Sequence, residues 1–210
     1  MDFETDNMPN LGAQIGQHAP DFTAKAVMPD NEINDSFNLK QYLKGSKGIL
    51  FFYPLDFTFV CPSEIIAFNN RLGEFVSRNT KIVAVSVDSH FCHRAWKATP
   101  LTKGGIGNIQ FPLVSDLNKN IGYDDSVLNE EGISYRATFL IDDNFTIRHY
   151  VVNDLPLGRN VDETLRMIDA LDHHTVHGEV CPAGWQKGDQ GMRATQEGVS
   201  DYLTSNADKL

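Results

Sequence analysis

The sequence has few cysteines and no long apolar run. Its 210 residues contain three cysteines, which are Cys61, Cys92 and Cys181. Three cysteines, an odd number and far apart in the sequence, do not form the disulfide framework of a small secreted domain. We therefore expect any role of cysteine to lie in its reactivity. The best apolar run, residues 49–60, is broken by Pro54 and Asp56 and falls short of the ~20 residues of a membrane span.

Positive charge is also scarce. The chain has 18 Lys and Arg residues against 28 Asp and Glu residues, a formal net charge of -10 at pH 7, and its basic residues are scattered. Nucleic acid is therefore an unfavourable partner, because its phosphates require a local basic surface, and anionic lipid is disfavoured by the same charge. The first ten residues are acidic and lack the basic start and apolar core of a secretory signal, so we expect a cytoplasmic location and no membrane partner.

Composition and length are those of one globular domain with an extension. Apolar residues make up 41% of the chain and charged residues 22%, which is ordinary for a folded protein. We expect residues 1–178 to form the main domain, because Gly178 is suited to end its last helix. Residues 179–210 are expected to form a C-terminal arm of turns with one short helix at residues 195–203.

The apolar pattern predicts a strand, a helix and a second strand in the first half of the chain. Residues 47–53 and 81–87 are short β-branched or aromatic runs, which are typical of buried strands. Between them, residues 62–78 place apolar side chains at the three- and four-residue spacings of an amphipathic helix. A parallel pair with a right-handed crossover is the expected arrangement.

Further elements follow this unit. We expect a helix over residues 89–98, a short strand over 110–114, and a hairpin of strands 137–141 and 145–152 with a three-residue turn. A last helix begins at Asn160, which has Glu163 at capping-box spacing, and ends at Gly178. This order of elements predicts an α/β protein with a thioredoxin-like fold.

Cys61 lies where the first predicted strand has ended and the first long helix begins. A helix N-terminus offers unpaired N–H groups and a positive dipole end, which favour a thiolate over a thiol, and Pro62 suits the opening turn. The residue three places after Cys61 is Glu64, so the C-x-x-C pair of a dithiol oxidoreductase is absent. A cysteine that attacks peroxide can use a remote partner to condense with its sulfenic acid, and Cys181 is the candidate.

Two groups of side chains could suggest a metal site. They are His90, Cys92 and His93, and His173, His177 and Cys181. A closed zinc site requires about four ligands, and Gly178 and Pro182 would interrupt the helix needed to align the second group, so we expect neither to bind metal. Cys92 is interpreted as a small apolar residue in the core or in a contact between protomers.

Several separated motifs resemble those of peroxiredoxins. Residues 54–62, PLDFTFVCP, resemble the active-site signature P-x-x-x-T-x-x-C. Residues 180–185, VCPAGW, resemble the resolving-cysteine signature of the typical two-cysteine subgroup, which includes the bacterial alkyl hydroperoxide reductase C proteins and thioredoxin peroxidases. Further matches lie at residues 87–93, 111–116 and 135–140, and agreement of several ordered motifs is more specific than one short pattern. The resemblance implies the peroxiredoxin variant of the thioredoxin-like fold, with a C-terminal extension.

The resemblance also implies roles for the residues of the active-site motifs. Cys61 would be the peroxidatic nucleophile that reduces hydrogen peroxide or a small organic hydroperoxide. Thr58 would hydrogen-bond the peroxide and the thiolate, and Pro54 would shield the pocket from water. Arg136 would place guanidinium donors beside the sulfur, with Glu64 orienting that arginine. Donors aimed at the oxygen charge that develops as the peroxide bond breaks stabilise the transition state, so these roles fit the chemistry.

Recycling and assembly are implied in the same way. Cys181 of a second protomer would form an intersubunit disulfide with Cys61, and a thioredoxin-like donor or a dedicated flavoprotein reductase would reduce it. The protein would be a homodimer that assembles to a decamer, with no metal, flavin or nicotinamide cofactor. Residues 104–107, GGIG, resemble an insertion that marks members prone to over-oxidation when paired with a C-terminal Tyr-Phe, whereas the tail here has Tyr202-Leu203. An oligomeric chaperone with secondary peroxidase activity is the alternative function.

Overall fold

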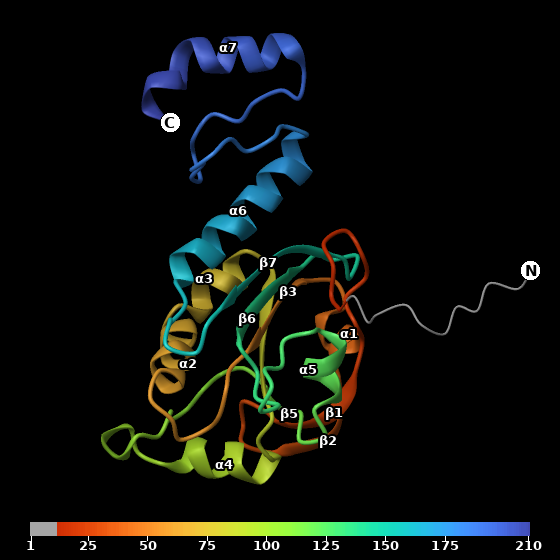
Figure 1. Ribbon diagram of the computed structural model, residues 1–210, viewed down its shortest axis with the longest axis vertical. Helices are drawn as coiled ribbons and strands as arrows, with labels where there is room; N and C mark the ends of the chain where they lie inside the picture. Colours follow the sequence, from red (N-terminus) through yellow and green to blue (C-terminus); the bar gives the residue numbers. More distant parts are fainter. Residues whose placement is uncertain (1–11) are drawn as a thin grey trace, which may run out of the picture. The chain divides into compact units, whose positions relative to one another are not determined.

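One mixed sheet organises the part of the chain up to Arg159 (Figure 1). The computed structural model describes residues 12–210. The strands of the sheet are β1 (Thr23–Val27), β2 (Ile33–Asn38), β3 (Lys47–Phe52), β4 (Thr80–Ser86), β5 (Leu113–Ser115), β6 (Arg136–Ile141) and β7 (Ile147–Asn153), in the spatial order β2-β1-β5-β4-β3-β6-β7. Strands β3 and β4 are parallel neighbours, which confirms the predicted strand-helix-strand unit.

Strand β3 shows how this sheet packs on both faces. Successive side chains of a strand point to opposite faces, and β3 is apolar on both. Phe51 stacks on Phe68 of a helix on one face, with ring centroids 4.8 Å apart. Leu50 and Phe52 belong to the core cluster on the other face. The first face is covered by α2 (Cys61–Asn70), α3 (Leu72–Ser77) and α4 (His90–Ala98), and the second by α1 (Leu39–Leu43) and α5 (Asn120–Asp124).

The single helix predicted over residues 62–78 is wrong in one respect, because the chain forms two helices there. Arg71 leaves helical geometry, with φ -101° and ψ 7°, between α2 and α3. The preceding Asn69 has a low helix propensity, and its side chain accepts a hydrogen bond from the backbone N–H of Gln110, 2.8 Å away. The apolar spacing of the segment is continuous across this break, so the pattern alone does not reveal it.

The turn between β6 and β7 is longer than the predicted three residues. Phe145, expected to begin the second strand, has φ 63° and therefore lies in the left-handed region. Asp142 organises the turn, because its Oδ1 accepts hydrogen bonds from the N–H groups of Asn144 and Thr146. The strand begins at Ile147 as a result. The short strand predicted over residues 110–114 begins only at Leu113, directly after Pro112, which has no N–H to donate to a ladder.

Two strands and two α-helices were not predicted from the sequence. Strands β1 and β2 form an antiparallel hairpin, and β1 also pairs antiparallel with β5, so this hairpin completes one edge of the sheet. The pattern of β2 is mostly polar, INDSFN, and only Phe37 is buried, which explains why it gave no strand signal. Helices α1 and α5 have five residues each, too few to show a helical period.

The second unit runs from Asn160 to Leu210 and is described by itself. It contains α6 (Val161–His177) and α7 (Gln196–Asn206). The side chain of Asn160 caps α6 by accepting the N–H of Asp162, and Gly178 ends the helix with φ 68°, as predicted. The structure groups α6 with the C-terminal segment, and the boundary predicted after residue 178 stays a prediction. Within residues 12–210, no helix combines the length and the hydropathy needed to cross a membrane.

Candidate active site

Cys61 is the first residue of α2, and its side chain is fully buried. Thr58, three residues earlier, places its hydroxyl 3.1 Å from the Cys61 sulfur and 2.7 Å from the carbonyl oxygen of Leu55. The single hydroxyl proton can be donated to either acceptor. Pro54 is buried at the start of the same loop. The structure therefore brings Thr58 and Cys61 together as predicted, within one tight segment that follows β3.

A second donor reaches the sulfur from β6. Nη1 of Arg136 lies 3.4 Å from the Cys61 sulfur and 2.6 Å from Oε2 of Glu64. Nε of Arg136 donates to the carbonyl oxygen of Leu155, 2.7 Å away, so the guanidinium is held at both ends. Arg136 is the first residue of β6, and β6 pairs with β3, so the sheet itself carries the guanidinium to the start of α2. The Thr58 hydroxyl and the Arg136 guanidinium therefore converge on the sulfur at the start of α2.

Glu64 bridges Arg136 to a second buried arginine, Arg159. Arg159 donates to Oε1 of Glu64 through its backbone N–H at 3.0 Å and its Nε at 2.9 Å, and to Oε2 through Nη2 at 3.0 Å. The side chains of all three are at most 5% exposed. Burial alone would raise the pKa of Glu64, but the hydrogen bonds and charge of Arg159 and the charge of Arg136 outweigh it and lower the pKa. Glu64 is therefore a carboxylate at neutral pH.

Arg159 is the site residue that sequence reasoning missed. Its Nη1 donates to the carbonyl oxygens of Phe52 and Ala137, at 2.8 and 3.0 Å, and its guanidinium lies over the ring of Phe51. It thereby ties β3, β6 and α2 together behind the sulfur. The only sequence signal for Arg159 was its position directly before the helix cap Asn160. That signal is weak, because a single arginine near a helix start is usually a surface residue.

Cys181 lies in the second unit, where its thiol is partly buried. The thiol donates to the carbonyl oxygen of Ala170 in α6, with sulfur and oxygen 3.4 Å apart. Burial raises the pKa of Cys181, the Arg166 charge lowers it and the Glu179 charge raises it, with a net upward shift. Cys61, Cys92 and Cys181 are all free thiols. The pairing of Cys61 with Cys181 stays a prediction.

Cys92 occupies a different environment in α4. Burial, followed by the charge of Asp56, raises the pKa of Cys92 to about 12. Its sulfur and one carboxylate oxygen each of Asp56 and Asp88 lie within 4.8 Å of one another. The expected absence of a metal site at Cys92 stays a prediction.

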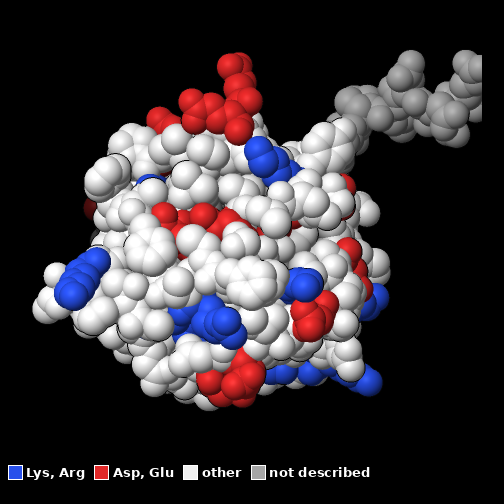
Figure 2. Space-filling model, turned by 90° about the horizontal axis from the view of Figure 1, so that it is seen from below, with Lys and Arg blue, Asp and Glu red and all other residues white. Residues whose placement is uncertain are grey.

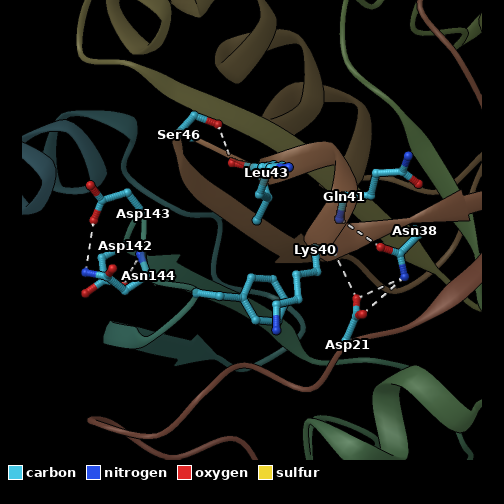
Figure 3. A pocket seen from close by; sticks show the side chains of 12 residues that line it. Asp21, Asn38, Lys40, Gln41, Leu43, Ser46, Asp142, Asp143 and Asn144 are labelled. Atoms are coloured by element: carbon cyan, nitrogen blue, oxygen red, sulfur yellow. Dashed lines mark hydrogen bonds between the residues drawn. The ribbon is translucent and has the colours of Figure 1, made fainter.

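A separate cavity of about 470 Å³ lies between the end of α1 and the β6–β7 turn (Figure 3). Its polar side chains mostly bond to their neighbours: Asn38 donates to Asp21, and Ser46 to the carbonyl oxygen of Leu43. None of the residues that line it belongs to the group around Cys61. The candidate active site is therefore the start of α2 rather than this cavity.

Comparisons with known proteins identify the family of the chain. Residues 15–150 match the model of the AhpC/TSA family, and residues 170–205 match that of the C-terminal domain of 1-Cys peroxiredoxin. The chain belongs to the AhpC/TSA family of peroxiredoxins. It is 56% identical to alkyl hydroperoxide reductase C of Helicobacter pylori over 192 residues, which are 91% of this chain and 97% of that protein. It is 50% identical to peroxiredoxin-1 of Gekko japonicus over 200 residues, which are 95% and 100% of the two chains.

Solved structures give the same result. The reduced 2-Cys peroxiredoxin of Plasmodium vivax matches with a TM-score of 0.88 and 51% identity, covering 90% of this chain and 98% of that one. The thioredoxin-like fold predicted from the sequence is confirmed. This protein of 210 residues is a thiol-dependent peroxidase. The chaperone alternative is not favoured, because the relatives are named for peroxide reduction or as peroxiredoxins.

Proposed function

We propose that Cys61 is the peroxidatic nucleophile of this peroxiredoxin. Its thiolate attacks one oxygen of hydrogen peroxide or of a small organic hydroperoxide. The S–O bond forms as the O–O bond breaks, and the leaving oxygen takes a proton to become water or an alcohol, which leaves Cys61 as a sulfenic acid. The convergence of Thr58 and Arg136 on the buried sulfur carries this proposal. Both donors are fixed before the reaction and can stabilise the charge that develops on the oxygens.

The proposed partner of the sulfenic acid is Cys181 of a second copy of the chain. Its sulfur attacks the Cys61 sulfur, water leaves, and an intersubunit disulfide forms. The free thiol of Cys181 supports this step. A thioredoxin or a dedicated flavoprotein reductase then reduces the disulfide by thiol–disulfide exchange.

The proposed assembly is a homodimer that associates further to a decamer. Strand β7 is an edge strand of the sheet, and its Tyr150, Val151 and Val152 are at least 39% exposed. An edge strand with exposed apolar side chains is suited to pairing with another chain, which supports the dimer. A Plasmodium yoelii peroxiredoxin modified at the N-terminus is described as forming an artifactual octamer, so one similar protein associates beyond a dimer.

We place the protein in the cytoplasm, without nucleic acid or membrane partners. The acidic net charge supports the exclusion of nucleic acid and anionic lipid. On the face drawn in Figure 2, basic side chains are separated by acidic and uncharged ones.

Peroxide consumption by three variants, each with one cysteine replaced by serine, tests the proposal. Cys61→Ser should abolish turnover, because a serine hydroxyl is un-ionised at neutral pH. Cys181→Ser should still consume one equivalent of peroxide but should form no disulfide-linked dimer on a non-reducing gel, whereas Cys92→Ser is the matched control and should form it. Retention of more than a few per cent of turnover in Cys61→Ser would assign the nucleophile elsewhere. Supplying thioredoxin or a flavoprotein reductase in parallel assays identifies the reductant.

A further inference from the structure

A buried polar network lies beneath the loop that joins β3 to α2, outside the residues proposed above to act on peroxide. Its centre is Asp56, which is 6% exposed. Oδ1 of Asp56 accepts a hydrogen bond from the Tyr53 hydroxyl at 2.8 Å, and Oδ2 lies 2.8 Å from Nδ1 of His93. The backbone N–H of Asp56 donates to Oδ2 of Asp88, also at 2.8 Å. We call Tyr53, Asp56, His93 and Asp88 the Asp56 network.

The hydrogen-bond partners in this network determine which atoms donate and which accept. Nε2 of His93 lies 3.2 Å from the carbonyl oxygen of Val114, and a carbonyl only accepts, so Nε2 carries a proton. One further proton lies between Nδ1 of His93 and Oδ2 of Asp56. Burial, and then the Asp56 charge, raise the pKa of Tyr53 well above its usual value, so its hydroxyl remains a donor. Both Asp56 oxygens and its N–H are therefore bound in one arrangement.

The network fixes a loop whose backbone is strained. Phe57 directly follows Asp56 and has φ 55°, in the left-handed region that a bulky residue rarely occupies. Such a conformation persists only where its surroundings hold it. The next residue is Thr58, whose hydroxyl lies 3.1 Å from the Cys61 sulfur. The chain thus passes from an anchored Asp56, through one strained residue, to the side chain that contacts the sulfur.

We propose that the Asp56 network positions the Thr58 hydroxyl at the Cys61 sulfur, so that Tyr53, Asp56 and His93 are positioning residues for the peroxide step. The inference rests on the roles proposed for Cys61 and Thr58. None of the three positioning residues is placed to touch the peroxide, and they act through the geometry of residues 56–58. Because a misplacement of about 1 Å can cost ~100-fold in rate, loss of the network slows peroxide reduction without removing any group that reacts.

A double-mutant cycle tests this proposal. Asp56→Asn is introduced into the wild-type chain and into Thr58→Ala, and Cys61 oxidation by hydrogen peroxide is followed by stopped-flow fluorescence. Alone, Asp56→Asn should slow oxidation by ~10-fold. In the Thr58→Ala background it should change the rate less than twofold, since no hydroxyl remains to be misplaced and coupled residues are non-additive. Tyr53→Phe removes one hydrogen bond from the network. It should also slow oxidation in the wild-type background but not in Thr58→Ala, by a smaller factor than Asp56→Asn. If Asp56→Asn does not fold, Tyr53→Phe serves as the test of the proposal.

Two further measurements separate positioning from general destabilisation. Iodoacetamide alkylation of Cys61 is measured in a Cys92→Ser and Cys181→Ser background, where Cys61 is the only cysteine of the chain. Alkylation needs no bound peroxide, so Asp56→Asn should change its rate less than threefold. Tyr42→Phe is the matched control, because Tyr42 packs on Phe37 away from the Cys61 loop, and it should leave both rates unchanged.

An equal loss from Asp56→Asn in both backgrounds would overturn the proposal, as would an unchanged peroxide rate in Asp56→Asn and Tyr53→Phe. An unchanged rate in Thr58→Ala would overturn it together with the proposed role of Thr58. The proposed role of Cys61 as nucleophile is tested separately by peroxide turnover in Cys61→Ser, and that result does not depend on the double-mutant cycle.

Discussion

Replacing Glu64 by glutamine isolates the contribution of the buried carboxylate between two arginines. Oε1 accepts two donors from Arg159, and Oε2 accepts one from Arg159 and one from Arg136. A glutamine side chain can keep the two bonds at one oxygen. Its NH2 group would face Nη1 of Arg136 and Nη2 of Arg159, both of which are donors. Glu64→Gln therefore removes the negative charge and places three donors against one another in a site whose side chains are at most 5% exposed.

The expected loss is large, because the two guanidinium groups stay buried without their counter-ion. Removing one partner of a buried ion pair costs ~3–5 kcal/mol. For a chain of this length, that corresponds to a fall of roughly 6–20 °C in Tm, at ~2–4 °C per kcal/mol. The peroxide rate should also fall by ~10-fold or more, since Arg136 loses the partner that aims its Nη1 at the Cys61 sulfur.

Chemical denaturation and stopped-flow oxidation of Cys61 measure both effects. The matched control is Glu163→Gln, because Glu163 pairs with Arg166 with 48% of its side chain exposed, and an exposed pair contributes ~1 kcal/mol or less. The pKa of Glu64 is lowered in the folded state, so its contribution is complete above the unfolded pKa of ~4.3 and is lost as the pH falls through the folded value. The wild-type advantage over Glu64→Gln should therefore shrink only in acid. A loss equal to that of Glu163→Gln at pH 7 would refute the reasoning.

Three further measurements have expected outcomes. Arg136→Met removes a fixed donor from the sulfur and should slow Cys61 oxidation by ~10²- to 10³-fold in stopped flow, and a change below tenfold would leave Arg136 a structural role. Cys92, with its pKa of about 12, is on the order of one part in 10,000 thiolate at pH 8, so mass spectrometry should find it alkylated last. Burial lowers the pKa of Lys97 to about 8, and its Nζ donates to the carbonyl oxygen of Met28. Since the unfolded pKa is ~10.4, the unfolded state holds the extra proton, and the unfolding free energy should rise between about pH 8 and 10.4 by at most ~3 kcal/mol relative to Lys97→Met.

The sequence predicted the elements whose apolar pattern is strong. The runs that became β3, β4 and α6 are continuous or regularly spaced, and their ends carry recognisable signals such as Asn160 and Gly178. Strand β2 could not be predicted, because its sequence is mostly polar and it pairs with β1 while burying only Phe37. The break at Arg71 depends on a hydrogen bond between Asn69 and the distant Gln110, which local spacing does not encode.

The candidate site was predictable to the extent that its residues lie in contiguous motifs. Thr58, Cys61 and Glu64 lie within one short segment of chain, and the motif resemblance added Arg136. Arg159 contacts Glu64 from 95 positions further along the chain, so only the folded sheet brings the two together. The Asp56 network is of the same kind, since His93 reaches Asp56 from α4, 37 positions away. Residues that support a site from distant elements carry no local pattern.

The two sulfurs proposed to form the disulfide are each held in a folded segment, and this predicts an effect of Gly191. A disulfide requires Cα atoms within ~7 Å, whereas Cys61 is fully buried at a helix start and the Cys181 thiol is bonded to α6. Beside Cys181, the Glu179 carboxylate lies 3.0 Å from Nε2 of His173, and a Cβ on Gly191 would overlap both groups.

Gly191→Ala should therefore loosen the attachment of the Cys181 segment to α6. A charge-assisted hydrogen bond at a partly exposed position contributes ~1 kcal/mol, so its loss should speed disulfide formation by ~5-fold. Faster disulfide formation leaves less sulfenic acid for a second peroxide, and the sulfinic fraction measured by mass spectrometry after a peroxide titration should fall. Gly73→Ala is the matched control, because a Cβ there meets no neighbouring atom. An unchanged rate of disulfide formation in folded Gly191→Ala would show that release of Cys181 does not limit this step.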